Sequence, residues 1–330
     1  MTPKTKAALL LLLTTVIWGA SFPTIRYSVA LVDPFAFTGI KFLFSAAALV
    51  PAALRRRGPA PGHAEGHEAP SPLLWLWTGL AAGALLTVGT SLQYVGMVWT
   101  TSANSGFITG LYVTLVPPLG LVLGRIPART VWAGLILGVS GMVLVSDPGG
   151  LGGFNRGDAL TLAADLFWAV HVLLVGRYAL RVNAIRFVAV QVGTVGLVCL
   201  SIAWFRGALP AEEAFAATLP FALFGILSVS ACYWFQVIAQ KHVHPSEAAL
   251  LLQLQSVFAA IFGMIFLGEA MTGLMWAGAA LMVTGSAIAQ RDSQQRRILP
   301  GSPRFRSLLI IRVLTAALVL ALCWAPLFLT

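Results

Sequence analysis

Few charged side chains stand inside the long apolar runs of this sequence, and those few are the first candidates for chemistry. Lys41 follows Pro34 by seven residues, and Asp165 follows Asp158 by seven. If both runs start at the external face of a bilayer, both groups lie about 10 Å deep. A charge inside a bilayer costs at least about 2.5 to 3.5 kcal/mol near the centre, so each of these intramembrane charges needs a reason, and the two groups could form an ion pair. For Lys41 an equal alternative is that its long side chain reaches back to the headgroups.

A polar helical face follows from the spacing in residues 158–178. At 100° per residue, Asp158, Thr161, Asp165 and Trp168 share one face, with His171 at its edge. Such a face is suited to lining a cavity. His171 could carry a proton near neutral pH, although a histidine hydrogen-bonded to a neighbouring helix is about twice as frequent.

Aromatic and amide side chains supply further candidates for binding a substrate. Aromatic rings suit aromatic or cationic molecules, but they are also common in helix packing, and buried amides contact neighbouring helices more often than ligands. Gln253 and Gln255 lie about 200° apart around one helix, so they cannot both face one cavity. Gln93 and Gln236 stand at approximately equivalent places in the two halves of the chain. The other substrate-binding candidates are Trp18, Tyr94, Asn104, Tyr112, Trp168 and His171.

The sequence contains no nucleophile and base motif, no HExxH pair and no Walker sequence, which argues against an enzyme or an ATP-driven pump. We expect no cofactor and no metal. The polar residues His63, Glu65, His67 and Glu68 could hold a metal ion, but the pattern favours a solvated loop. The isolated cysteines, Cys199, Cys232 and Cys323, are typical of small core residues.

The elements that position these residues follow from composition. Of 330 residues, 58% are hydrophobic and only 10% are charged, against roughly 25% in soluble domains. Such a chain cannot cover a water-soluble surface, so it is an integral membrane protein with the lipid bilayer as its surroundings. Its net charge of +10 comes from basic residues in short gaps between apolar runs, which makes nucleic acid an unfavoured partner.

Ten apolar runs are long enough to cross a bilayer core of about 30 Å as helices. Helices are the only solution, because unpaired backbone groups in hydrocarbon are costly and the runs are too continuous for barrel strands. The first run resembles a signal peptide or signal anchor, and we expect it to be retained. The predicted spans are 7–27, 34–54, 73–96, 102–124, 129–146, 158–178, 185–205, 219–240, 246–268 and 272–290.

The positive charges predict the orientation of these spans. With a cytoplasmic N-terminus, 16 of the 21 Lys and Arg residues lie in gaps on the cytoplasmic side. Because positive residues are retained on that side, we expect a multi-pass protein of the cytoplasmic (inner) membrane with its N-terminus inside.

The two sets of five spans contain related patterns. Trp18 is followed after eight and nine residues by Arg26 and Tyr27, and Trp168 is followed after nine and ten by Arg177 and Tyr178. Because five is odd, the two sets enter the membrane from opposite sides, which predicts an inverted repeat of residues 1–146 and 147–290. Inverted repeats are typical of alternating access, with a binding site near the midplane between the halves.

At this point the sequence resembles the EamA-type permeases of the drug/metabolite transporter superfamily over residues 1–290. The motifs that carry the resemblance are Trp18-Gly19-Ala20-Ser21-Phe22, Gly106 to Tyr112 running on to Val116-Pro117, Gly157-Asp158, Pro245 to Ala249, and Leu267-Gly268-Glu269. The resemblance implies an all-α fold of ten transmembrane helices in two inverted five-helix repeats, which moves small metabolites, usually outward.

Two features depart from the family pattern. Gln255-Ser256 stand where members commonly carry Glu-Pro, so the resemblance makes Gln255 a binding candidate without the carboxylate. Members usually stop after the tenth span, whereas residues 291–330 form a basic connector followed by the apolar segment 308–330. That segment predicts an eleventh helix and an external C-terminus; the alternative is an extension without function on a ten-span protein.

These patterns together predict a secondary transporter that exports a small organic metabolite or drug by alternating access, with coupling to protons as a hypothesis. An uptake permease, or a membrane-embedded receptor or enzyme on the same fold, stays open as the alternative. The sequence leaves the substrate and the oligomeric state open.

Overall fold

The computed structural model describes residues 1–55, 73–122, 127–145, 155–268 and 272–291, and this part of the chain is helical apart from short connections. The helices in chain order are α1 (Pro3–Leu31), α2 (Pro34–Arg55), α3 (Leu74–Gly96), α4 (Ser102–Gly110), α5 (Tyr112–Val122), α6 (Arg129–Val145), α7 (Arg156–Tyr178), α8 (Ala184–Phe205), α9 (Glu212–Gly225), the π-helical segment η1 (Ile226–Ala231), α10 (Cys232–Ala239), α11 (Pro245–Leu252), α12 (Gln255–Leu267) and α13 (Gly273–Arg291).

Several helices begin where the sequence supplies a cap for their free N–H groups. The Asn155 side chain accepts from the N–H groups of Gly157 and Asp158, and the Asp158 carboxylate accepts from the Asn155 N–H, which closes a capping box at the start of α7. Proline opens α2 at Pro34, where its missing N–H costs nothing. These caps set the depth at which each helix presents its side chains.

The prediction of an all-α membrane protein is confirmed. Within the described residues, seven helical stretches are long and apolar enough to cross a membrane: 3–31, 34–55, 74–96, 156–178, 184–205, 212–239 and 245–266. The remaining predicted spans correspond to the interrupted stretch 102–122 and to α6 and α13, which are shorter or less apolar.

Three predicted spans differ from the structure. The run 102–124 is broken at Leu111, between α4 and α5, and the run 246–268 is broken at Gln253 and Leu254, between α11 and α12. At both breaks the N–H groups of Leu111 and Leu254 bond three residues back instead of four, to Ile108 and Leu251. The run predicted to begin at residue 219 begins at Glu212, because Pro220 is accommodated inside α9 and acidic residues occupy its first turn.

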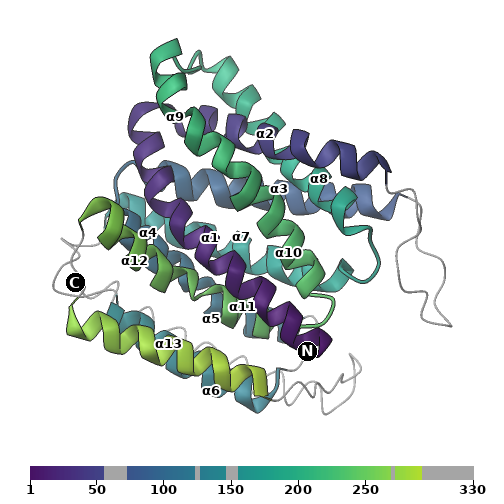
Figure 1. The fold of residues 1–330 in the computed structure, drawn as a ribbon, viewed down its shortest axis with the longest axis vertical. Helices are drawn as coiled ribbons and strands as arrows, with labels where there is room; N and C mark the ends of the chain where they lie inside the picture. Colours follow the sequence, from purple (N-terminus) through teal and green to yellow (C-terminus); the bar gives the residue numbers. More distant parts are fainter. Residues whose placement is uncertain (56–72, 123–126, 146–154, 269–271, 292–330) are drawn as a thin grey trace.

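Figure 1 shows the helices packed side by side, with α6 and α13 together along one edge and α2 beside α8 at the opposite edge. Between them, α3 packs against α7 and α8, and α1 packs against α10 and α12. The short helix α4 packs against α7 and α12, so the two interrupted stretches contact each other in the interior. The connector and the predicted eleventh helix (292–330), and the loop with His63 to Glu68, lie outside the described residues.

Candidate functional site

A cavity lies in the interior, at the level where the two interrupted stretches break. Thr109 and Tyr112 come from either side of the first break, and Leu252 and Gln255 from either side of the second. Helices broken at corresponding places of two halves mark binding sites in many transporters, because their ends present polar groups in the membrane interior. The polar and aromatic side chains that line the cavity are Trp18, Ser21, Phe22, Lys41, Phe42, Thr90, Gln93, Tyr94, Thr109, Tyr112, Trp168, His171, Ser228, Tyr233, Gln236 and Gln255.

The breaks are stabilised by side-chain donors from neighbouring helices. Ser286 Oγ of α13 donates to the Leu250 carbonyl at 2.5 Å, next to the second break. Ser256 Oγ of α12 donates to the Gly106 carbonyl of α4 at 2.7 Å, which joins the two interrupted stretches. Because a backbone group without a partner is costly in the membrane interior, these bonds allow the breaks to persist.

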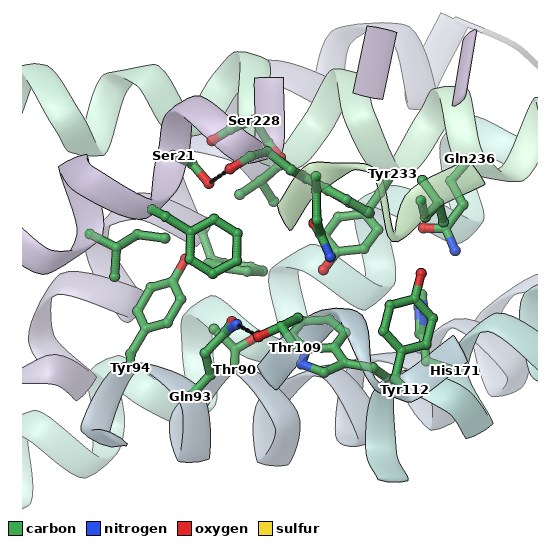
Figure 2. A pocket seen from close by; sticks show the side chains of 18 of the residues that line it. Ser21, Thr90, Gln93, Tyr94, Thr109, Tyr112, His171, Ser228, Tyr233 and Gln236 are labelled. Carbon is green, nitrogen blue, oxygen red and sulfur yellow. Dashed lines mark hydrogen bonds between the residues drawn. The ribbon is translucent and has the colours of Figure 1, made fainter. Parts of the chain in front are cut away.

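Two walls of the cavity face each other in Figure 2. Thr90, Gln93 and Tyr94 lie with Tyr112 and His171 on one side. The opposite side carries the labelled residues Ser21, Ser228, Tyr233 and Gln236. The walls come from helices that are distant in the sequence, so a ligand between them contacts both halves of the chain.

Trp18 and Tyr233 form the aromatic centre of one wall. Their rings meet edge to face at a centroid distance of 5.4 Å, and the Tyr233 ring also lies 5.7 Å from the His171 ring. Trp18 Nε1 donates to the Ser228 carbonyl at 2.7 Å. Ser228 belongs to η1, where the Cys232 N–H donates to the Leu227 carbonyl five residues back, as in a π-helix. The π-helical segment therefore presents a backbone acceptor that orients the Trp18 indole.

Several polar atoms in the cavity wall have no hydrogen-bond partner within the described part of the chain. They are Thr90 Oγ1, Trp168 Nε1, Ser228 Oγ and Gln236 Oε1. Buried polar groups are nearly always paired, so these four are available to a ligand or to water. They offer donors and acceptors but no charge.

Lys41 is the cation of this cavity. Its side chain is 1% exposed, and Nζ donates to Tyr94 Oη at 3.3 Å. Nζ also lies 5.8 Å from the centre of the Phe37 ring and 5.6 Å from that of Tyr94. The side chain is therefore buried among aromatic rings, which excludes the alternative in which it reaches back to the headgroups.

The hypothesised ion pair between Lys41 and Asp165 is not formed. Asp165 is fully buried, does not line the cavity, and neither carboxylate oxygen has a hydrogen-bond partner within the described residues. The two side chains are apart because α2, which carries Lys41, packs mainly on α8, α9 and η1, whereas α7 packs on α3, α4 and α5. Asp165 interacts electrostatically with Tyr112, whose ring lines the cavity.

His171 lines the cavity and also binds a neighbouring helix. Its Nε2 lies 3.1 Å from Gln191 Oε1 of α8, in a buried hydrogen bond. The sequence-based interpretation of an interhelical histidine therefore agrees with the structure. The predicted polar face of α7 divides: Trp168 and His171 reach the cavity, while Asp158 accepts a hydrogen bond from Thr100 and caps its own helix.

Asn104 does not line the cavity. It lies half-buried in the first turn of α4, where its backbone N–H bonds to the capping hydroxyl of Thr101. The predicted separation of the two glutamines agrees with the structure, since Gln255 lines the cavity whereas Gln253 lies against α6 at Gly138. The residues predicted from the sequence that do line it are Trp18, Lys41, Tyr94, Tyr112, Trp168, His171 and Gln255.

Sequence reasoning missed much of the polar lining. Tyr233 follows the π-helical segment, and no local pattern places its ring beside Trp18. Gln93 and Gln236 were recognised as equivalent positions of the two halves, but they were not among the predicted binding residues. The small hydroxyl residues Ser21, Thr90, Thr109 and Ser228 resemble many other serines and threonines of the spans, so only packing distinguishes them.

Comparison with known proteins gives one family. Residues 5–147 and again 155–290 match the model of the EamA-like transporter family. A protein of Archaeoglobus fulgidus named "Uncharacterized transporter" is 26% identical over 83% of this chain and 82% of its own length. The Escherichia coli K12 protein "Uncharacterized inner membrane transporter YedA" is 25% identical over 81% of this chain and 85% of its own.

A more distant relative has a described substrate class. The "Probable terminal-alkyne amino-acid exporter" of Streptantibioticus cattleyicolor is 24% identical over 90% of this chain and 98% of its own length. A solved crystal structure shares the fold, with a TM-score of 0.67 at 20% identity over 86% of this chain and 98% of that one. These relatives are transporters and not enzymes, in agreement with the sequence-based expectation.

Proposed function

The chain belongs to the EamA-like transporter family, and from that premise we propose that it exports a small organic metabolite or drug across the cytoplasmic membrane by alternating access. The observation that carries the proposal is the interior cavity, which is lined from both family matches at the level of the two helix breaks. A site between two mobile halves can open to one side of the membrane at a time.

Two inverted repeats, 1–146 and 147–290, are part of the proposal. The packing supports it. If each span is replaced by its counterpart five spans away in the other half, every pair of packed helices named below becomes another pair that is also packed, or stays the same. The pair α3 with α7 becomes α10 with α1, the pair α1 with α12 becomes α7 with α4, and the pairs α2 with α8 and α6 with α13 are unchanged. Such an exchange is expected of a pseudo-two-fold axis in the membrane plane.

The proposed orientation of the chain in the membrane and the proposed direction of transport rest on separate observations. The excess of Lys and Arg in alternate gaps supports a cytoplasmic N-terminus. The relative named as an inner membrane transporter supports the same membrane for this chain. The relative named as an amino-acid exporter supports outward movement of a small organic molecule.

Proton coupling is the proposed source of energy. His171 lies in the cavity wall, and Asp165 lies buried near Tyr112 without a hydrogen-bond partner within the described residues. Both groups can exchange protons only when a conformational change gives them access to water. Changing their protonation in one orientation of the cavity would link proton movement to substrate movement.

The test is substrate flux from liposomes. Purified protein is reconstituted into liposomes loaded with a metabolite pool, and efflux is measured by mass spectrometry with and without an imposed pH gradient. We expect specific compounds to leave faster than from protein-free liposomes, and the gradient to change their rate. If correctly folded protein moves no compound under either condition, transport is contradicted and a receptor or enzyme on this fold becomes the better explanation.

A further inference from the structure

Lys41 is the only lysine or arginine that lines the cavity among the described residues, and no carboxylate there pairs with it. No acidic side chain lines the cavity, and no carboxylate lies within ion-pair distance of Nζ, among the residues that the structure describes. An ammonium group has three donors, and the structure assigns one of them to Tyr94 Oη. A buried cation with this surrounding is costly unless an anion completes it.

An anionic ligand would supply what the protein lacks at this position. A carboxylate can accept the Nζ hydrogen bonds of Lys41 that Tyr94 does not accept, and its negative charge balances the ammonium group. The aromatic faces of Phe37 and Tyr94 stabilise the ammonium only partly, because a ring offers a quadrupole and not a full charge. Since Lys41 is the only lysine or arginine among the described lining residues, we expect one negative charge on the ligand to be matched there.

The remainder of the cavity fits an apolar body. Trp18, Tyr112, Trp168 and Tyr233 present rings, and the polar groups near them are hydroxyls, amides and the His171 imidazole. We therefore propose that the transported substrates are organic monoanions, with the carboxylate held by Lys41 and Tyr94 and an apolar or aromatic body against these rings. This inference rests on the proposed transport function, and it makes Lys41 a substrate ligand instead of a partner of Asp165.

Gly225 positions the lysine. A Cβ at residue 225 would lie 2.5 Å from Lys41 Cγ and 3.0 Å from Ser45 Oγ, so only glycine leaves room for the lysine stem. The contact places Gly225 of α9 directly against α2, at the stem of the Lys41 side chain. A methyl group there would displace the ammonium without changing the charge of the cavity.

The experiment compares ligands that differ in one group. The protein in lipid nanodiscs is titrated by calorimetry with 3-phenylpropionate, with its primary amide and with 3-phenylpropylamine. We expect the carboxylate to bind about tenfold or more tightly than the amide, and Lys41→Gln to abolish that preference while leaving amide binding in place. Lys41→Arg should keep the preference, and Gly225→Ala should weaken binding of the carboxylate alone.

Lys6→Gln is the matched control, because Lys6 is an exposed cation outside the cavity and its removal should change none of the affinities. Equal affinity for carboxylate, amide and amine, an unchanged preference in Lys41→Gln, or no binding of any of the three compounds would each overturn the inference. Liposome efflux separates the two proposals. If the protein releases compounds from liposomes but does not prefer monoanions, only the role of Lys41 is contradicted. If it binds the carboxylate through Lys41 but releases no compound, transport is contradicted.

Discussion

Trp18 connects the aromatic wall of the cavity to the π-helical segment. The indole N–H donates to the Ser228 carbonyl, while the ring packs on Tyr233. Phenylalanine would keep most of the ring contact and remove the donor, leaving a buried carbonyl without its partner. We therefore expect the orientation of the Trp18 indole to depend on this hydrogen bond.

We predict that Trp18→Phe slows substrate efflux about two- to tenfold, since a net hydrogen bond contributes about 0.5 to 1.5 kcal/mol. The measurement is the initial efflux rate in liposomes at matched protein content. Trp204→Phe, at an exposed position of α8, is the control and should leave the rate unchanged. Equal rates for Trp18→Phe and the unsubstituted protein would show that the wall does not depend on this bond.

His171 is the residue on which the coupling hypothesis is tested. Glutamine keeps a hydrogen-bonding group opposite Gln191 but cannot bind a proton at physiological pH. We expect His171→Gln to retain efflux without a gradient and to lose most of the acceleration by a pH gradient. The readout is the ratio of efflux rates with and without the gradient.

His242→Gln removes an exposed histidine between α10 and α11 and should leave this ratio intact. A ratio that is the same in His171→Gln as in the unsubstituted protein would contradict proton transfer through His171. Asp165→Asn would then be the remaining variant with which to locate the coupling group.

At the scale of elements, α6 and α13 pack through glycines. A Cβ at Gly134 would lie 2.5 Å from the Gly285 carbonyl oxygen, and a Cβ at Gly285 would lie 2.6 Å from the Gly134 carbonyl oxygen. Such close backbone approach is typical of helix pairs in membranes, where van der Waals packing replaces the hydrophobic effect. This pair lies at the edge of the bundle, and α13 supplies the Ser286 donor that stabilises the break in the ninth span.

We predict that Gly134→Ala destabilises the protein by about 1 to 3 kcal/mol, because overpacking forces the helices apart. Gly273→Ala is the matched control, since a Cβ at the start of α13 meets no atom within 4 Å. Thermal unfolding in detergent compares the two variants. An equal midpoint for both would contradict the close approach of α6 and α13.

At the scale of the whole molecule, alternating access requires contacts that form on one side of the membrane and separate in the other state. Lys4 at the start of α1 and Glu247 in the first turn of α11 form an ion pair at 3.1 Å. The pair joins the first span to the ninth on the N-terminal side. If transport opens the cavity to that side, this contact must separate in each cycle.

We predict that joining the two positions stops transport. In a background without Cys199, Cys232 and Cys323, Lys4→Cys and Glu247→Cys are linked by a short bis-thiol-reactive reagent, and efflux should fall by most of its value and return when the link is cleaved by reduction. The single-cysteine variants control for modification. Unchanged efflux in the linked protein would mean that the halves do not separate there.

The C-terminal segment 308–330 has a test at the same scale. The predicted eleventh helix would place Thr330 outside, because the tenth span ends on the cytoplasmic side in the proposed orientation. A reporter that is active only on the external side, fused at Thr330, should therefore be active. A fusion that behaves as cytoplasmic would contradict the eleventh span.

The sequence by itself determined the class of protein, the approximate helical runs and the family resemblance. The physical reason is that a membrane helix satisfies its own backbone hydrogen bonds, so its existence depends on the hydropathy of about 20 consecutive residues and on local caps. Aromatic candidates such as Trp18 and Tyr112 were also identified, because they stand in the motifs that carry the family resemblance.

Only the tertiary structure decided which side chains meet. Lys41 and Asp165 were predicted at similar depth, yet they lie in different interfaces because α2 and α7 pack on different neighbours. Likewise, the break at Leu111 precedes Pro117 by more than one turn, and the two interrupted stretches are joined near it by the bond from Ser256 to the Gly106 carbonyl. Contacts between distant segments decide which face of a helix points inward and where a helix is interrupted. The spacing of neighbouring residues carries no signal for those contacts.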